Sequence, residues 1–424
     1  MKKRSFWLTF AFCAILGLAF PKINAAADNT YQQLRILVDM IELISKNYAD
    51  EVEYKKLIRG AARGMVDELD EFSQYMDEDV YERVKSETEG EFGGIGIRLD
   101  VKDGWPTVIT PMPGTPAYKA GIYPGDKIIK IEGQSTKDMI VDDVVKRLRG
   151  KPGTKVKLTI AREPQNKDED WIQKDLEVAR DTIKPEVVKY KMLEDSLAYI
   201  RIADFSGHML EDFSSALKNA VSQKAQGLII DLRYNPGGLL MGSVDLAKMF
   251  LGGEKLIVYT KGKKDSNYQE FRADKTAEYE NLPIVVLINR YSASASEIFA
   301  GAMQDNKRAV IIGENSFGKA SVQQIMPLSD GSALRLTIAH YYTPGGKMIH
   351  RDPKTGKGGI KPDLEVKIPK EDEIKIFEGM EEIYYPDKKE DSVKDKKKVK
   401  DECLQRALEI LKARDAFAGL RAGK

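Results

Sequence analysis

The chain contains very few histidine and cysteine side chains. Its 424 residues include three histidines and two cysteines. His208, His340 and His350 stand in no recognisable triad motif, so a serine, histidine and aspartate arrangement is not supported. No group of residues has the spacing of metal ligands. We therefore expect no metal site and no cofactor, and any catalysis must use other residue types.

An excess of charge of one sign is also missing. Lys and Arg together number 67 and Asp and Glu number 66, which leaves a formal net charge of +1. The whole chain therefore creates no field that favours nucleic acid or a membrane surface. Its length predicts several domains, and a hydrophobic share of 42% is enough to build their cores.

Only one long apolar run exists, and it lies at the N-terminus. A basic start precedes apolar residues 6–20, and small residues follow. This order is typical of a signal peptide, here residues 1–27, and predicts a location in the periplasm or on the outer face of the cytoplasmic membrane. The run is short for a membrane span, although an uncleaved anchor stays open. Cleavage would remove Cys13 and leave Cys403 alone, so the mature protein could form no intrachain disulfide.

Residues 28–88 show helical periodicity in two stretches. Apolar residues recur at helical spacing at Leu34, Leu37, Val38, Ile41 and Ile44, and again at Leu57, Ile58, Ala61, Met65, Val66 and Leu69. This segment contains little else to bury two apolar faces. We therefore expect an N-terminal helical region that packs on the body of the protein or on a second subunit.

Residues 89–180 change to short strands separated by glycine turns. A Gly-Gly-Ile-Gly-Ile loop, later glycine turns and a helix expected at residues 139–148 resemble a PDZ domain, a small barrel-like sheet with helices. In that family backbone N–H groups of a glycine loop converge on a terminal carboxylate, and an exposed strand edge accepts an extended peptide. The resemblance implies capture of a protein's C-terminal tail, with the carboxylate bound by Gly93, Gly94, Ile95, Gly96 and Ile97.

A candidate nucleophile follows residues 283–288, an apolar run typical of a buried strand. The chain turns through Ser-Ala-Ser-Ala-Ser-Glu, residues 292–297, into a helical pattern. Ser294 and Glu297 match a capping box, which places the Ser294 hydroxyl beside free N–H groups and the positive end of a helix dipole. That hydroxyl could attack a carbonyl while neighbouring amides hold the oxyanion. Taken alone, however, the motif is most often an ordinary helix cap.

A base for this serine is offered by Phe-Gly-Lys-Ala-Ser-Val-Gln-Gln, residues 317–324. Lys319 could accept a proton only in its neutral form, which requires burial to lower its pKa from about 10.4. Gln323, four residues on along an expected strand, lies on the same face and can hydrogen-bond the amine without adding charge. Lys319 alone would be interpreted as a solvated loop lysine, but the combination favours a site.

A second strand, loop and helix pattern lies upstream. The apolar run at residues 227–232 leads to Asn-Pro-Gly-Gly, and a helical pattern follows. If this strand and the strand at residues 283–288 are parallel, their loops reach the same carboxyl edge of the sheet, where open α/β sheets place their sites. This arrangement predicts that the Asn-Pro-Gly-Gly loop meets the turn that carries Ser294.

These motifs together resemble the catalytic signature of the carboxyl-terminal processing proteases, also called tail-specific proteases, of peptidase family S41. The resemblance implies that Ser294 is the nucleophile, Lys319 the general base and Gln323 the residue that orients the lysine. It also implies an oxyanion hole from the N–H groups of Ala295 and Gly238. The implied catalytic domain is a crotonase- or Clp-like α/β serine protease fold.

Three nearby residues need a separate interpretation. Ala320 follows the lysine where the family usually has glycine, so alanine would be strained there if the backbone required a positive φ. Asp231 and Arg233 could be taken for catalytic groups because they precede the upstream loop. Capping, or bracing of that loop, is their favoured role.

The chain is therefore expected to be α/β and multidomain. A catalytic domain at residues 181–370 follows the PDZ domain, and residues 371–424 form a charged linker and a short amphipathic helix that docks on the body or on another subunit. The expected activity is that of a serine endopeptidase acting on proteins with exposed, unstructured C-terminal tails. A homodimer or higher oligomer and an activator or adaptor protein stay open as partners, and nucleic acid is not expected.

The alternative is an inactive PDZ scaffold that only binds protein C-termini. The presence of Ser294, Lys319 and Gln323 together counts against it.

Overall fold

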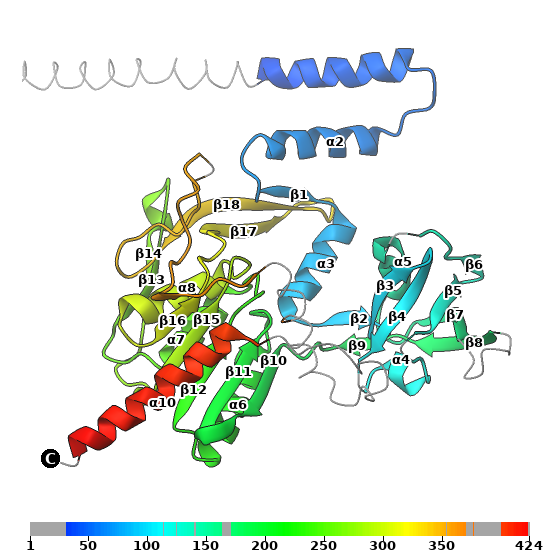
Figure 1. Ribbon diagram of the computed structural model, residues 1–424. Helices are drawn as coiled ribbons and strands as arrows, with labels where there is room; N and C mark the ends of the chain where they lie inside the picture. The colour runs from blue at the N-terminus through cyan, green and yellow to red at the C-terminus, as the bar shows by residue number, and fades with distance from the viewer. Residues whose placement is uncertain are drawn as a thin grey trace, which may run out of the picture. The chain divides into compact units, whose positions relative to one another are not determined.

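Figure 1 shows the computed structural model of the chain, which describes residues 31–112, 114–123, 125–139, 141–162, 171–352, 354–369, 376 and 400–422. The predicted signal peptide lies outside these residues, as does most of the predicted linker. Within the described ranges no helix is long and apolar enough to cross a membrane. The chain divides into two compact units, Met1–Asp77 and Glu78–Lys424.

The first unit is mainly helical. Residues 31–47 form a helix, and α2 (Tyr54–Asp67) and the short strand β1 (Gln74–Met76) follow. The two predicted helical stretches are thus confirmed. Several members of their apolar stripes are exposed to solvent, namely Leu34, Val38, Ile58, Met65 and Leu69. Packing of these side chains on the body of the protein or on a second subunit stays a prediction.

The second unit begins with α3 (Glu78–Glu89) and then forms the PDZ sheet. Its strand order is β3-β4-β5-β7-β8, with β6 paired to β5. The strands are β3 (Ile97–Lys102), β4 (Trp105–Pro111), β5 (Lys127–Ile131), β6 (Gln134–Ser135), β7 (Lys155–Arg162) and β8 (Ile172–Ala179). Two helices, α4 (Pro116–Lys119) and α5 (Val141–Leu148), share a separate core with this sheet, which includes Ile128, Val144 and Val156. The helix predicted at residues 139–148 is confirmed.

A two-stranded antiparallel sheet lies where the chain enters and leaves this part. It pairs β2 (Phe92–Gly94) with β9 (Asp181–Ile183). Gly93 has no room for a side chain, because a Cβ would lie 2.1 Å from the carbonyl oxygen of Gly150.

The remaining chain is built on a six-stranded sheet with the order β10-β11-β12-β15-β16-β19. Only β10 is antiparallel to its neighbour, and the other pairs are parallel. The strands are β10 (Val188–Met192), β11 (Leu197–Ile202), β12 (Gly227–Asp231), β15 (Ile284–Ile288), β16 (Val310–Gly313) and β19 (Leu364–Glu365). The short helix η1 (Glu194–Ser196) connects the first two of these strands. The predicted parallel pairing of residues 227–232 with residues 283–288 is confirmed, because β12 and β15 are adjacent and parallel.

Helices cover both faces of this sheet, so the central strands are apolar on both sides. Side chains alternate along β12: Leu228 and Ile230 join the core formed with α6 (Met209–Ser222), α7 (Leu240–Lys248) and α8 (Ala295–Asp305). Ile229 faces the other way, into a smaller core that includes Cys403 and Leu411 of α10 (Glu402–Ala422).

A second, antiparallel sheet carries part of the candidate site. Within it, β18 (Ala333–Tyr342) pairs with both β17 (Ser321–Pro327) and β13 (Leu256–Gly262), and β13 also pairs with β14 (Gln269–Arg272). The short helix η2 (Asp265–Asn267) joins β13 to β14.

Candidate active site

Ser294 lies at a sharp turn between the carboxyl end of β15 and the first residue of α8. Its φ of 54° and ψ of −113° are unusual for a residue with a side chain, and such a conformation costs roughly 1–3 kcal/mol. The hydroxyl of Ser292 stabilises the turn, because it donates to the carbonyl of Leu232 at 2.8 Å and accepts from the N–H of Asn289 at 2.9 Å. Ser294 is only half-buried, whereas Ala295 is fully buried. The serine therefore stands at a helix N-terminus with partial access to solvent.

Glu297 connects this turn to the loop before β17. Its Oε2 accepts the N–H of Ser294 at 2.8 Å and the N–H of Lys319 at 2.9 Å. Its Oε1 accepts the hydroxyl of Ser316 at 2.5 Å and the N–H of Gly318 at 2.6 Å. The carboxylate is fully buried, and this burial raises its pKa although the four donors act in the opposite direction. The sequence predicted Glu297 only as part of a helix cap, and its contacts with the lysine loop were missed.

The glycine loop after β12 lies directly against the serine. A Cβ on Gly237 would be 2.7 Å from the Cβ of Ser294 and 3.0 Å from the backbone nitrogen of Ala295. The loop is joined to the serine turn because the carbonyl of Asn235 accepts the N–H of Ala293 at 3.0 Å. The structure thus brings the two predicted loops together at the carboxyl edge of the sheet.

The predicted oxyanion residue Gly238 follows at once, with a φ of 140°. A Cβ there would lie 2.5 Å from the carbonyl oxygen of Phe205. Gly237, whose N–H donates to Asn235 Oδ1 at 2.8 Å, is the glycine in contact with Ser294, and sequence reasoning did not single it out. Among the described residues, the N–H groups of Gly238 and Ala295 donate to no backbone carbonyl.

Lys319 lies two residues before β17 and Gln323 lies within it. The N–H of Phe317 donates to the carbonyl of Ser292 at 3.0 Å, so this loop runs alongside the serine turn. Lys319 precedes the strand, and Gln323 lies within it opposite Thr337. Both side chains are half-buried. The backbones of the predicted nucleophile and the predicted base therefore bind the same carboxylate oxygen of Glu297.

Ala320, where the family usually has glycine, is fully buried and is not among the residues with positive φ. The positive φ in this loop belongs instead to Gly318, at 91°. A Cβ on Gly318 would lie 2.7 Å from the Cβ of Arg351. The backbone strain that the sequence suggested at Ala320 is therefore absent from this position.

The three histidines lie elsewhere in the fold. His340 is in β18, as predicted, and its ring centroid lies 5.6 Å from that of His350. His208 precedes α6, with Nε2 3.1 Å from the carbonyl oxygen of Pro185. Within the described residues, no group of three or more His, Cys, Asp or Glu side chains could hold a metal ion.

Asp231 and Arg233 form a buried ionic network just before the glycine loop. Both side chains are fully buried, and the guanidinium binds Asp231 Oδ2 at 2.6 Å and Asp401 Oδ2 at 2.7 Å. Tyr199 donates its hydroxyl to Asp231 at 2.8 Å. Burial alone would raise the pKa of Asp231, but Arg233 outweighs it and the pKa is lowered. These contacts agree with the predicted bracing role, whereas Asp401 was not identified from the sequence.

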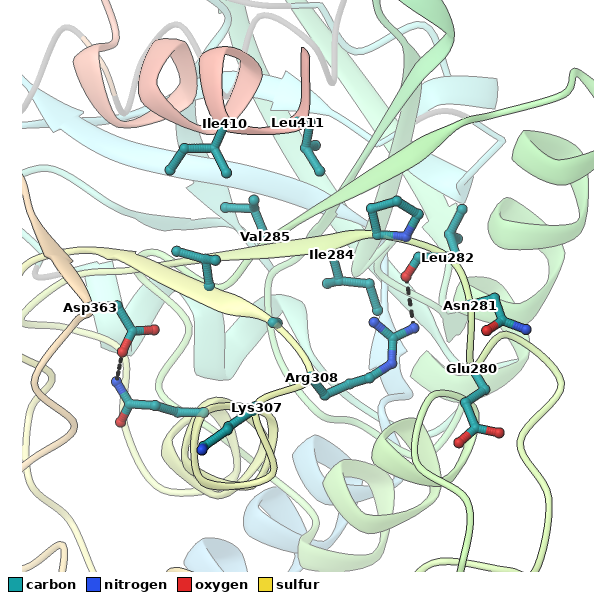
Figure 2. Close-up of a pocket in the computed structure, with 14 residues that line it drawn as sticks. Glu280, Asn281, Leu282, Ile284, Val285, Lys307, Arg308, Asp363, Ile410 and Leu411 are labelled. Atoms are coloured by element: carbon teal, nitrogen blue, oxygen red, sulfur yellow. Dashed lines mark hydrogen bonds between the residues drawn. The ribbon is translucent and has the colours of Figure 1, made fainter. Parts of the chain in front are cut away.

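A cavity of about 600 Å³ lies at the opposite, amino end of β15 and β16 (Figure 2). Figure 2 shows Arg308 donating to the carbonyl of Leu282, at 2.7 Å, while Ile410 and Leu411 of α10 face Val285. Because Ser294 follows the carboxyl end of β15, this cavity is separate from the candidate site.

The predicted carboxylate loop of the PDZ part is divided between two strands. Gly93 and Gly94 belong to β2, Ile95 is buried, Gly96 has a φ of 75°, and Ile97 begins β3. Strand β3 is the last strand of its sheet, and α5 contacts it.

Comparisons with known proteins match three separate stretches of the chain. The model of peptidase family S41 matches residues 196–366, that of the PDZ domain matches residues 83–161, and that of the activating protease CtpB N-terminal domain matches residues 19–80. A carboxy-terminal-processing protease of Bartonella bacilliformis is 40% identical over 87% of this chain and 83% of its own length. The carboxy-terminal processing protease CtpA of Bacillus subtilis is 36% identical over 84% of this chain and 72% of its own length.

Among solved structures, a photosystem II D1 C-terminal processing protease matches 78% of this chain and 92% of its own, with 27% identity and a TM-score of 0.47. The sequence relatives and the domain matches together show that the chain belongs to the carboxy-terminal processing proteases of peptidase family S41, with a PDZ domain and an N-terminal domain.

Proposed function

We propose that the chain is a serine endopeptidase with Ser294 as nucleophile, Lys319 as general base and Gln323 as the residue that orients the lysine. The observation that carries this assignment is the shared carboxylate of Glu297, which binds the N–H groups of Ser294 and Lys319. Because one carboxylate binds both backbones, it fixes the position of the serine turn relative to the lysine loop. Catalysis depends on such fixed geometry.

In the proposed reaction, the neutral amine of Lys319 accepts the proton of the Ser294 hydroxyl as its oxygen attacks the substrate carbonyl. The protonated amine then gives that proton to the leaving amine, and an acyl-enzyme remains on Ser294. Water deprotonated by the same lysine attacks the ester and releases the carboxylate product. Gln323 supplies a neutral hydrogen-bond partner that leaves the lysine free to lose its charge.

The oxyanion of each tetrahedral intermediate would be held by the N–H groups of Ala295 and Gly238. Support comes from the position of the glycine loop against Ser294 and from the N–H groups themselves, which bind no backbone carbonyl among the described residues. Ala295 is the first residue of α8, so its N–H also lies at the positive end of that helix.

We extend this proposal to the architecture. The parallel strands with helices on both faces, and a nucleophile at the start of α8, support a crotonase- or Clp-like catalytic domain at residues 181–370. The proposed remaining parts are a signal peptide at residues 1–27, a helical region at 28–88, a PDZ domain at 89–180 and a C-terminal segment at 371–424. The protein would then act outside the cytoplasm.

The PDZ domain would deliver substrates by their C-terminal tails. An extended peptide could add beside β3, the terminal strand of its sheet, next to α5, with its carboxylate on the loop from Gly93 to Ile97. The match to the N-terminal domain of an activating protease supports a further protein partner for residues 19–80. No metal or organic cofactor is required by this mechanism.

Lys319→Arg tests the base directly. Arginine keeps the positive charge and cannot become neutral, so turnover of a tail-bearing protein should disappear while tail binding stays intact. Lys275→Arg, at an exposed position, is the matched control and should behave as wild type. Appreciable cleavage by Lys319→Arg would contradict the Ser/Lys assignment. A wild type that binds tails but cleaves none would favour the scaffold alternative.

A further inference from the structure

The buried guanidinium of Arg233 joins the C-terminal helix to the proposed oxyanion loop. We propose that Asp401, which precedes α10, is a positioning residue for peptide hydrolysis and acts through Arg233. This inference rests on the proposed function of the Ser294 site. It makes α10 part of the machinery that holds that site in its productive geometry.

The contact between Asp401 and Arg233 is bidentate. Arg233 Nη1 donates to Asp401 Oδ1 at 2.9 Å, and Nη2 donates to Oδ2 at 2.7 Å. Asp401 Oδ1 also accepts the N–H of Leu404 at 3.1 Å, so the same carboxylate holds the first turn of α10. Two parallel N–H to oxygen bonds fix the orientation of a guanidinium as well as its position.

Asp231 cannot replace Asp401 in this network. Its carboxylate accepts from Nε and Nη2 of Arg233, but Nη1 donates to Asp401. Arginine stays charged at all relevant pH values, and the Arg233 side chain is fully buried. Replacing the Asp401 carboxylate with a neutral amide would remove the negative charge and one of the two acceptor oxygens and would turn an N–H group toward the buried guanidinium, so the loop would have to rearrange.

A shift of Arg233 would displace the residues that follow it along the chain, and these residues contact the active site. Tyr234, next along the chain, donates its N–H to Asn289 Oδ1 at 3.0 Å. Asn235 then binds the serine turn through its carbonyl, and Gly237 contacts Ser294. Arg233 therefore precedes a loop whose residues are held by several contacts, so a shift of Arg233 would also move the loop.

The rest of α10 docks through apolar contacts that do not depend on Asp401. Cys403, Ala407 and Leu411 are buried against strands of the main sheet, and α10 runs beside β15 and β16 (Figure 1). Burial raises the pKa of the Cys403 thiol to about 12. Modification of Cys403 therefore reports whether the helix has left the sheet, because only an exposed thiol can form reactive thiolate readily.

The experiment compares Asp401→Asn, Asp401→Glu and wild type in the full-length chain, with a tail-bearing protein as substrate. We expect kcat to fall by about tenfold to a hundredfold in Asp401→Asn, the size of effect caused by small misplacement of catalytic groups. KM and tail binding should stay unchanged, and labelling of Cys403, located by mass spectrometry, should remain slow. Asp401→Glu, which keeps the carboxylate, should recover part of the lost kcat.

The control is Glu409→Gln on the same helix, which removes an exposed ion pair with Arg406 and should leave kcat unchanged. A kcat for Asp401→Asn within twofold of wild type would overturn the proposal. So would a loss of activity accompanied by rapid labelling of Cys403 and not recovered by Asp401→Glu, since Asp401 would then only stabilise the fold. Failure of the proposed function is separate, because wild type would then cleave no better than Ser294→Ala.

Discussion

Glu297 shows how much of the candidate site depends on one side chain that does not react. Its carboxylate receives four donors from two loops that are far apart in the sequence. An acceptor-only group suits this position, since every neighbour that it contacts there offers a hydrogen. The expected roles of Ser294 and Lys319 both require this carboxylate to stay in place.

Glu297→Gln should therefore lower kcat strongly, by about a hundredfold or more, because an amide turns an N–H group toward N–H donors. The exposed Glu211, in the first turn of α6, gives a matched control, and Glu211→Gln should keep normal activity. Steady-state cleavage of a tail-bearing protein measures both variants. Equal activity of the two would show that the four contacts are dispensable.

Gly237 provides a second test at this scale. Gly237→Ala adds a Cβ only 2.7 Å from both the carbonyl oxygen of Ala293 and the Cβ of Ser294, so activity should be lost. Gly253→Ala is the control, because Gly253 also has a positive φ but has open space around it. Both variants should lose about 1–2 kcal/mol of unfolding free energy from the backbone alone, because an L-residue is strained at a positive φ. Chemical denaturation and a cleavage assay on each would separate the two effects, and an active Gly237→Ala enzyme would contradict the packing described here.

Single residues also mark the limit of what the sequence can predict. The residue types for a nucleophile, a base and an oxyanion loop are recognisable because each has its own chemistry and a local strand or helix pattern. The contact of Gly237 with Ser294 and the bonds from Glu297 to Ser316 and Gly318 join distant loops. The spacing of residues along one segment cannot predict such contacts, because they depend on how separate loops pack together. The condition under which Ala320 would be strained is not met, since the loop takes its positive φ at Gly318.

At the level of elements, the two parallel strands β12 and β15 were predictable from their apolar runs and following helices. Their adjacency places both loops at one sheet edge, and the structure confirms it. The docking of α10 was left open between the body and another subunit. It packs on the main sheet because Cys403, Ala407 and Leu411 fill the core behind Ile229. The ion pair between Arg233 and Asp401 could not be predicted, because the segment before α10 contains many acidic and basic residues and nothing in the sequence distinguishes Asp401 from the others.

The Asp231 and Arg233 pair predicts how stability depends on pH. Because the folded-state pKa of Asp231 is lowered, its contribution to unfolding free energy is fully present above its ordinary pKa of about 3.9 and is lost as the pH falls through the folded value. Asp231→Asn leaves the Arg233 charge partly unpaired, which should cost about 3–5 kcal/mol near neutral pH.

Urea unfolding of wild type and Asp231→Asn at several pH values measures this contribution. The difference between the two proteins should be largest near neutrality and should shrink in acid. A constant difference across this range would show that the ionised carboxylate is not the source of the stability. Asp245→Asn, which removes a half-exposed ion pair with Lys248, is a control expected to change stability by less than about 1 kcal/mol.

For the whole molecule, the chain combines parts that are built on separate cores. The PDZ sheet and the main sheet have separate cores, and β2 and β9 pair where the chain passes between them. The order of these parts was predictable from changes in periodicity and glycine content along the sequence. What covers the exposed apolar residues in the first unit stays a prediction, because a stripe of Leu and Ile indicates a covering surface without identifying it.

The most direct test of the central claim uses a protein that bears an unstructured, apolar C-terminal tail. Cleavage by wild type is compared with cleavage by Ser294→Ala, and each enzyme is also given the same substrate without its tail. The account predicts rapid cleavage only when both Ser294 and the tail are present, with tail binding retained by Ser294→Ala. Cleavage that persists in Ser294→Ala would contradict the assignment of the nucleophile, and equal cleavage of the tailless substrate would contradict delivery by the PDZ domain.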